Sequence, residues 1–277
     1  MRMVLALVGV LVLTVAVVAG VVALGVVQPS WVPYIAVVSF VVVATTVSKY
    51  TSPRQLMLQA VGAEFVDRDR GLLERLSALA DVPVPRLASV DSAVPNAFTA
   101  GVRRRGATIV LTAGLEQLLA EEELEAVLAH ELAHIANRDA GVMTVASIPR
   151  TLGETLIGEQ GAIFYVWMVI WWFGIPIWAL GSLLTLALSR YREYAADRGS
   201  ALLTGRPAAL MSALVKLSGE DAQVPTDDLR RLARVEAFWV VPTGRTRFAV
   251  FSDHPPLEKR LARLEEMARE MGQPVGA

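Results

Sequence analysis

The sequence contains no cysteine among its 277 residues. This absence excludes a disulfide framework and any thiolate-bound metal, so a metal site would have to use histidine, aspartate or glutamate side chains. Histidine is scarce too, with three residues only: His130, His134 and His254. Two of them lie within one short stretch, which makes that stretch the first candidate for a functional site.

An excess of either charge is also missing. The chain has 26 Lys and Arg against 27 Asp and Glu, so no basic excess predicts nucleic-acid binding and no acidic tract predicts a disordered tail. Charged residues make up 19% of the chain and hydrophobic residues 54%, whereas a soluble domain is about 25% charged. The composition therefore predicts an integral membrane protein that contacts a lipid bilayer and no nucleic acid.

Two long apolar runs stand near the start of the chain, at residues 3–27 and 31–47. The first is long enough to cross a hydrocarbon core of about 30 Å, and longer than the apolar region of a secretory signal. Arg2 precedes the runs and Lys49 follows them, while the turn between them has no basic residue. We therefore predict a transmembrane hairpin over residues 1–50, with both ends in the cytoplasm.

Residues 51–140 have the mixed composition of a soluble domain. Leucines recur at helical spacing in residues 67–80, and the later segment 122–137 is strongly helical after a run of glutamates. Strand-like runs lie between them, at residues 86–90, 97–102 and 107–111, with a turn at 103–106. These patterns predict the first part of a catalytic domain, with a small β-sheet.

The predicted helix 122–137 carries the motif HExxH, formed by His130, Glu131 and His134. Residues four apart lie one turn above each other, so both imidazoles can bind one tetrahedral Zn²⁺ while Glu131 reaches its open position. A catalytic zinc lowers the pKa of its bound water to about 7 and needs a carboxylate to carry the proton. Two solvated histidines on an amphipathic helix are the alternative interpretation.

A third ligand is available further along the chain. Glu193 precedes Asp197 by one helical turn, in a predicted helix at residues 191–203. Glu193 can complete a zinc site with the two motif histidines, and Asp197 can accept a proton from the second nitrogen of a zinc-bound imidazole. We therefore predict one Zn²⁺ per chain, with Glu131 as the catalytic residue.

The segment between the ligands, residues 141–189, is hydrophobic, and its densest part, residues 164–188, is long enough for one complete span. Ligands of one ion must lie on the same side of the bilayer, so the segment crosses an even number of times. We favour an internal transmembrane hairpin, in which residues 141–157 form the partner span. The alternative is a dense run that breaks at residues 174–176 and re-enters, and the insertion depth of residues 141–160 stays open.

Residues 190–277 turn polar again and supply the second part of the catalytic domain. Further helical patterns lie at residues 207–218, 227–239 and 255–270. The predicted fold is mainly α-helical and membrane-integral, with about four transmembrane helices and a zincin-like (gluzincin) domain with a small β-sheet. The expected segments are residues 1–50, 51–140, 141–189 and 190–277.

Four further residues are candidate substrate contacts. His254 either starts a helix before two prolines, or stabilises the oxyanion of the tetrahedral intermediate. Asn96, Ala97 and Phe98 begin either a plain edge strand or a strand to which an extended peptide adds. Asp139 ends the motif helix or contacts a nearby arginine.

Three motifs resemble those of HtpX-type membrane zinc peptidases, relatives of the CAAX prenyl proteases: HELAHIANRD, SRYREYAADR and DHPPLEKRL. The resemblance covers nearly the whole chain, including PNAFTAG at residues 95–101. It implies zinc binding by His130, His134 and Glu193, and catalysis by Glu131. It also implies proteolytic quality control of membrane or misfolded proteins. We expect a multi-pass protein of the plasma membrane, and the position of the basic residues predicts that its catalytic domain faces the cytoplasm. The alternatives are a zinc-binding membrane sensor or adaptor without turnover, and a protease that processes prenylated proteins.

Overall fold

The computed structural model describes residues 61–101, 103–150, 164–218 and 255–273, together with residues 30, 33 and 58. The chain divides into two compact units. Unit 1 combines Met1–Ser52 with Gly141–Ser189, and unit 2 combines Pro53–Ala140 with Arg190–Ala277. The predicted hairpin at residues 1–50, the predicted helix at 227–239 and His254 lie outside the described residues, apart from residues 30 and 33.

Unit 2 contains a four-stranded sheet with the strand order β1-β2-β4-β3. The strands are β1 (Glu64–Val66), β2 (Arg86–Val90), β3 (Ala97–Ala100) and β4 (Thr108–Thr112). β4 pairs antiparallel with β3 and parallel with β2, and β1 joins β2 in antiparallel register. The three predicted strands and their hairpin turn are confirmed, whereas β1 was not predicted, because three largely exposed residues give no alternating pattern. β3 forms one edge of this sheet.

Two helices follow β4 directly. Thr112 ends the strand and begins α5 (Ala113–Leu118), where its Oγ1 accepts a hydrogen bond from the Leu115 backbone N–H at 3.3 Å. α6 (Glu121–Asn137) starts with three glutamates, whose charge suits a helix N-terminus. Glu123 accepts a hydrogen bond from the Ala120 backbone N–H at 2.8 Å and another from Lys216 Nζ at 2.7 Å. The motif helix is thus held at its start.

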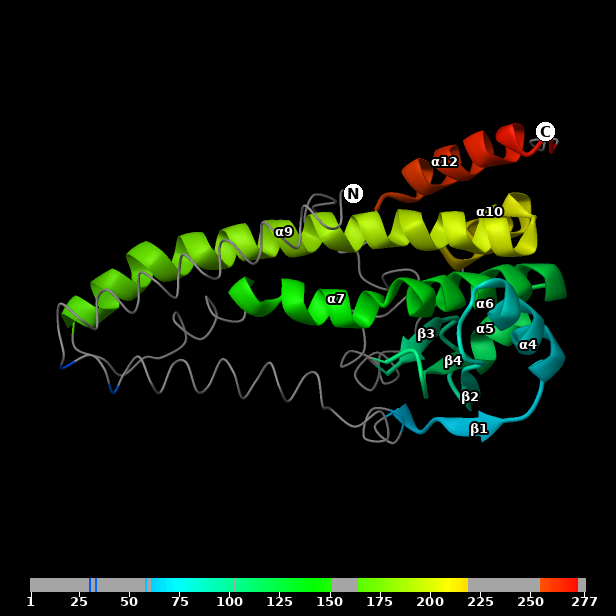
Figure 1. The fold of residues 1–277 in the computed structure, drawn as a ribbon, viewed down its shortest axis with the longest axis horizontal. Coiled ribbons are helices and arrows are strands. Elements are labelled where there is room, and N and C mark those ends of the chain that lie inside the picture. The colour runs from blue at the N-terminus through cyan, green and yellow to red at the C-terminus, as the bar shows by residue number, and fades with distance from the viewer. Residues whose placement is uncertain are drawn as a thin grey trace. The chain divides into compact units, whose positions relative to one another are not determined.

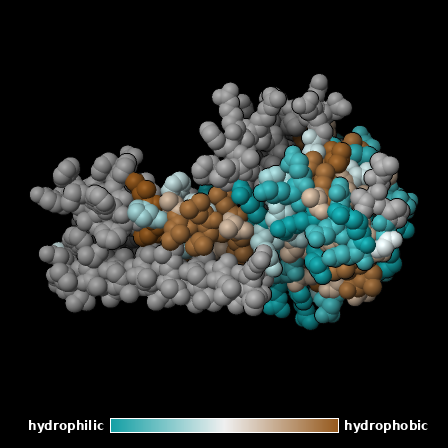
Figure 2. Space-filling model, turned by 90° about the horizontal axis from the view of Figure 1, so that it is seen from above, coloured by the Kyte–Doolittle hydropathy of each residue, from teal (hydrophilic) through white to brown (hydrophobic). Residues whose placement is uncertain are grey.

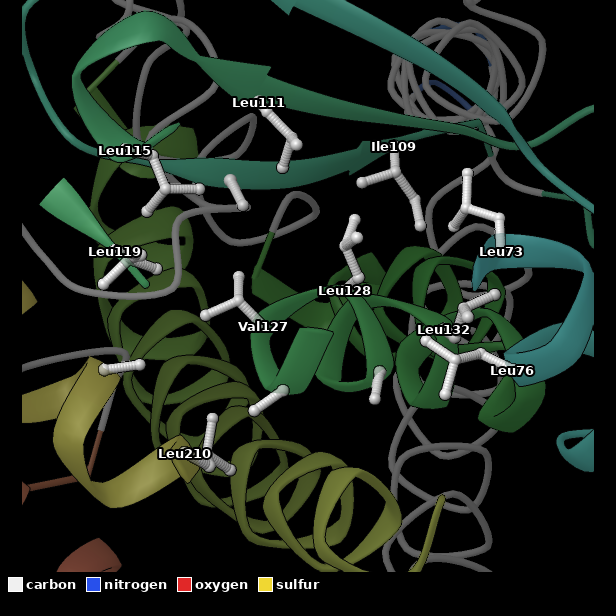
Figure 3. Close-up of a cluster of buried hydrophobic side chains, with 14 of the residues drawn as sticks. Leu73, Leu76, Ile109, Leu111, Leu115, Leu119, Val127, Leu128, Leu132 and Leu210 are labelled. Carbon is white, nitrogen blue, oxygen red and sulfur yellow. The ribbon is translucent and has the colours of Figure 1, made fainter. Parts of the chain in front are cut away.

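α6 runs through the centre of the hydrophobic core. Figure 3 shows its Leu128 and Leu132 directed among side chains from the sheet, from α4 (Arg70–Leu79) and from α10 (Pro207–Ser218). Ile109 of β4 and Leu210 of α10 are fully buried in this cluster. Because apolar contacts surround α6, the helix has little freedom to rotate, and the direction of its polar motif residues is fixed by packing.

Three more helices complete the described chain, as Figure 1 shows: α7 (Asp139–Ala146), α9 (Phe164–Thr204) and α12 (Leu257–Glu270). α9 continues through Gly174 and Pro176 as one helix, so the alternative in which the dense run breaks there is wrong. Among the described helices, none meets the combined length and hydropathy required to cross a bilayer. The count of four transmembrane helices therefore stays a prediction.

The described surface of unit 2 is mostly hydrophilic, with smaller hydrophobic patches, in the view of Figure 2. This distribution agrees with the mixed composition of residues 51–140 in the sequence. The mainly helical class with a small mixed sheet is confirmed as well.

α6 and α9 approach each other closely because small residues lie between them. A Cβ atom placed on Gly199 of α9 would lie only 2.5 Å from the Cβ of Ala133 of α6. Nearby, Ser200 Oγ donates a hydrogen bond to the Ala126 carbonyl of α6 at 2.6 Å. Gly199 therefore sets the spacing of the two helices beside His134.

We predict that Gly199→Ala destabilises the protein by about 1–3 kcal/mol, because the added methyl group forces α6 and α9 apart. Gly71→Ala is the matched control: Gly71 also lies in a helix, but a Cβ there meets nothing within 4 Å. It should stabilise the protein by about 0.5–1 kcal/mol. Thermal unfolding of the two purified variants would measure both changes in stability. Equal changes in Gly199→Ala and Gly71→Ala would contradict a tight contact between α6 and α9.

Candidate metal centre

α6 directs both motif histidines toward one point. The Nε2 atoms of His130 and His134 lie 3.1 Å apart, and the two rings are nearly perpendicular. His130 is completely buried, and the His134 side chain is 12% exposed. The i, i+4 spacing places the rings on one helix face, as the sequence predicted.

Glu193 of α9 faces the same point from the opposite helix. Its Oε2 lies 3.7 Å from His130 Nε2, and its Oε1 lies 3.6 Å from His134 Nε2. One ligand atom from each of the three residues falls within 4.8 Å of the others, a grouping that can hold a metal ion. The structure therefore brings together the three residues predicted as ligands.

The spacing of these atoms suits zinc. Ligand atoms on a tetrahedral zinc, bound at about 2.0–2.2 Å, lie about 3.3–3.6 Å from one another. The two imidazole nitrogens lie 3.1 Å apart, and each lies 3.6 or 3.7 Å from a different oxygen of Glu193, distances close to this range. Two imidazoles and one carboxylate are also the donor set of a known class of catalytic zinc sites with an open fourth position.

The second nitrogen of each imidazole contacts a buried carboxylate. Asp197 Oδ1 lies 3.1 Å from His130 Nδ1, and Asp139 Oδ2 lies 2.5 Å from His134 Nδ1. Such contacts hold the proton on Nδ1 and leave Nε2 free to bind metal. Arg138 adopts a left-handed conformation (φ 57°), which ends α6 immediately before Asp139.

Each of these carboxylates contacts an arginine in turn. Arg260 of α12 makes two hydrogen bonds to Asp197, at 2.8 and 2.6 Å, and Arg192 of α9 lies 3.3 Å from Asp139. An arginine beside Asp139 agrees with the prediction from the sequence, whereas Arg260 was not predicted. A signal was present, because Arg260, Leu264 and Ala268 recur every four residues and form the buried stripe of α12. A charge on such a stripe indicates a buried ion pair.

The charge of the cluster also suits a divalent cation. The carboxylates around the two histidines are those of Glu131, Asp139, Glu193 and Asp197, and the guanidinium groups in contact with them are those of Arg192 and Arg260. With all of these ionised and both histidines neutral, four negative charges face two positive ones. A divalent cation would neutralise the difference.

The same carboxylates affect the protonation of His130. Burial by itself would lower the pKa of His130, but the adjacent Asp197 and Glu193 outweigh burial and raise this pKa to about 9. Burial would raise the pKa of Asp197, whereas Arg260 and His130 hold it below its ordinary value. Without metal, a proton on His130 therefore supplies part of the positive charge that the site requires.

Glu131 lies beside the histidines and is buried, with 2% of its surface exposed. Thr99 Oγ1 of β3 donates a hydrogen bond to Glu131 Oε2 at 2.7 Å. Thr99 lies within the PNAFTAG segment but was not singled out in the sequence, because nothing local to either residue predicts a contact between a strand and a helix. The bond fixes one carboxylate oxygen of Glu131 against the edge strand.

The residues predicted to contact the substrate are mostly buried in the structure. Ala97 and Phe98 are both 0% exposed, so their side chains belong to the core and are not side-chain contacts for a substrate. Asn96 is buried too, and its Oδ1 accepts a hydrogen bond from the Ala97 backbone N–H at 2.8 Å. The Asn96 backbone N–H also donates to Thr112 Oγ1 at 2.8 Å, which anchors the start of β3. His254 lies outside the described residues.

We predict that the metal-free protein loses stability as the pH rises from 6.5 through about 9. The folded pKa of His130 lies above its ordinary value of 6.5, so protonation stabilises the fold fully below pH 6.5, and this contribution disappears above the folded value. Thermal unfolding at several pH values, with chelator present, would measure this loss of stability. The variant His130→Gln should lack the part of the pH dependence that His130 causes. A wild-type protein with the same pH profile as His130→Gln would contradict the prediction.

Comparisons with known proteins support the same assignment. The model of peptidase family M48 matches residues 67–268, which include every predicted ligand. Protease HtpX homolog 2 of Methanosarcina mazei is 41% identical over 245 residues, covering 81% of this chain and 82% of that protein. The Protease HtpX homolog of Moorella thermoacetica is 39% identical over 270 residues, covering 90% and 89%.

A solved structure shares the fold. The crystal structure of S. mikatae Ste24p aligns with a TM-score of 0.55 at 18% identity, covering 92% of this chain and 67% of that one. At this identity the likeness concerns the fold alone. The family match and the HtpX relatives, together with the convergent His130, His134 and Glu193, show that the chain belongs to peptidase family M48 and is a metallopeptidase of the HtpX type.

Proposed function

We propose that this metallopeptidase is a zinc-dependent endopeptidase, in which His130, His134 and Glu193 hold one Zn²⁺ and Glu131 is the catalytic residue. The observation that carries the proposal is the convergence of these three ligands from two helices. Glu131 lies in the same motif turn. The combination of a three-ligand site and an adjacent carboxylate is that of hydrolysis by an activated water.

The chemistry divides between the ion and the chain. A bound zinc would supply an activated water and polarise the carbonyl of the scissile bond. Glu131 takes the proton of the attacking water and gives it to the departing amine. The hydrogen bond from Thr99 keeps one Glu131 oxygen in place and leaves the other available for this transfer. The carboxylates of Asp197 and Asp139 hold the imidazoles in the tautomer that binds metal.

The edge strand β3 is the proposed binding place for the substrate backbone. It lies at one end of the described sheet, and its Thr99 contacts Glu131. An extended peptide that adds to such an edge is held by backbone hydrogen bonds, which depend little on sequence. The second proposal, an oxyanion contact from His254, rests on the sequence.

The substrates that fit this recognition are unfolded or misfolded proteins, including membrane proteins. We propose that the enzyme acts in protein quality control at the plasma membrane, anchored by hydrophobic segments at residues 1–50 and 141–189, with residues 51–140 and 190–277 in the cytoplasm. Support comes from the apolar composition and the position of the basic residues. Membership of a peptidase family favours turnover over the alternative of a zinc-binding adaptor.

We predict that Glu131→Gln retains one zinc per chain but loses about 10²–10⁴-fold in the rate of casein cleavage, because the change removes the proton acceptor and touches no ligand. The matched control is Glu125→Gln on the same helix, whose carboxylate pairs with Arg75 instead. Metal analysis and cleavage assays, with and without chelator, would be run on the full chain. Cleavage by Glu131→Gln within a few-fold of the control would contradict the assigned role.

Membrane topology is tested most directly with single cysteines, because the natural chain has none. We predict that a cysteine at Gln160 reacts with an impermeant thiol reagent added to intact cells, since the internal hairpin turns outside the cytoplasm. A cysteine at Arg138, next to the metal site, should be protected. Protection at Gln160 would reject two complete crossings, and labelling at Arg138 would reject the cytoplasmic orientation.

A further inference from the structure

A buried arginine of α12 contacts the metal centre through Asp197. Arg260 of α12 is 3% exposed and binds Asp197 through two nitrogens: Nε donates to Oδ2 at 2.8 Å and Nη2 donates to Oδ1 at 2.6 Å. The same Oδ1 lies 3.1 Å from Nδ1 of His130. Arg260, Asp197 and His130 thus form a continuous chain of contacts that ends at a predicted zinc ligand.

This geometry constrains the Asp197 carboxylate strongly. A guanidinium group presents its donors in a planar fork, so a two-nitrogen contact fixes both the position and the plane of the carboxylate. A carboxylate held in this plane, 3.1 Å from Nδ1 of His130, favours the tautomer with the proton on Nδ1 and so leaves the lone pair of Nε2 for the metal.

Arg260 also faces a ligand directly. Its Nη1 lies 3.8 Å from Oε2 of Glu193, so the guanidinium group lies between the two acidic residues of α9. The second imidazole has a different arrangement, because Arg192, which contacts Asp139, belongs to α9 itself. Of the two arginines, only Arg260 links the site to a separate helix.

α12 has other attachments to unit 2. Its Leu264 belongs to the hydrophobic core, and Arg263 stacks over the ring of Tyr194 at 3.5 Å. Beyond the end of the helix, the side chain of Gln273 donates a hydrogen bond to the Gly205 carbonyl. These contacts do not involve Arg260, so α12 can stay folded against α9 and α10 when the arginine is replaced.

We propose that Arg260 is a positioning residue that acts through Asp197 on His130, and that it links zinc binding to the docking of α12. The inference rests on the proposed zinc site. If the docked helix raises zinc affinity, bound zinc must stabilise the docked helix by the same factor, because a coupling free energy between two binding events is reciprocal.

The first part of the proposal is that Arg260 strengthens zinc binding. It is tested by the zinc affinity of the full chain, measured by competition with a chromophoric chelator. We expect Arg260→Met to weaken zinc binding by about 10- to 100-fold, as changes behind a metal ligand do. Arg260→Lys should recover only part of the loss, since it restores the charge without the fork. The matched control is Arg269→Met, an exposed arginine on the same helix whose Nε donates to the Glu265 carbonyl of that helix; it should change affinity by no more than about twofold.

A double-variant comparison separates positioning from general stability. In an Asp197→Asn background the carboxylate that Arg260 fixes is absent, so adding Arg260→Met should change zinc affinity by less than about twofold. The double variant removes the charges of Arg260 and Asp197 together, while Glu193 keeps its two histidine neighbours, which keeps the test valid if Arg260→Met alone does not fold. A further tenfold loss in the double variant would overturn the route through Asp197.

The second part of the proposal, the link between zinc binding and the docking of α12, is tested by hydrogen exchange. Zinc should slow amide exchange in α12 of the wild type relative to the chelated protein, with a smaller effect in α4 of the same unit. Arg260→Met should lose most of this zinc-dependent protection, measured at saturating zinc. Equal protection of α12 in Arg260→Met and in the control Arg269→Met, or equal zinc affinity of these two variants, would overturn the inference. A wild type that binds no zinc would refute the proposed metal site instead.

Discussion

The close contact of α6 and α9 is the constraint on which the site depends. The histidines and Glu193 belong to helices separated by a long hydrophobic segment, yet their ligand atoms must converge within a few ångströms. Helix axes normally lie about 8–10 Å apart, according to the side chains between them. Gly199 facing Ala133 allows an approach that a larger residue would prevent. The chemistry of the metal centre is therefore supported by a position with no side chain at all.

A second requirement is that buried charges have partners. The site contains several carboxylates in an interior otherwise formed by leucine and alanine, and an unpaired charge there would cost several kcal/mol. Each imidazole contacts a carboxylate, and each of those carboxylates contacts a guanidinium group. Such a layered arrangement keeps the site anionic enough to attract a cation without leaving isolated charges. It also makes the site rigid, because each group has its orientation set by the next.

Local rules explain which features the sequence could predict. HExxH depends on helical spacing alone, so the direction of His130 and His134 followed from their positions, and the pairing of β3 with β4 followed from a short turn. The contacts of Thr99 with Glu131 and of Arg260 with Asp197 join segments 32 and 63 residues apart. No periodicity encodes such partners. The burial of Asn96 was missed for a related reason, because an asparagine that anchors a strand and one that faces a cleft look the same in sequence.

The distribution of the site along the chain has a consequence for biosynthesis. Ribosomes make the protein from the N-terminus, and the parts of the site appear in the order β3, α6, α9 and α12. A growing chain therefore exposes HExxH well before Glu193 exists, and Arg260 is added later still. Chains that end before residue 193 lack a full ligand set and therefore cannot form the three-ligand site. The dispersal of the ligands thus delays the site until the sheet, α6 and most of α9 have been made.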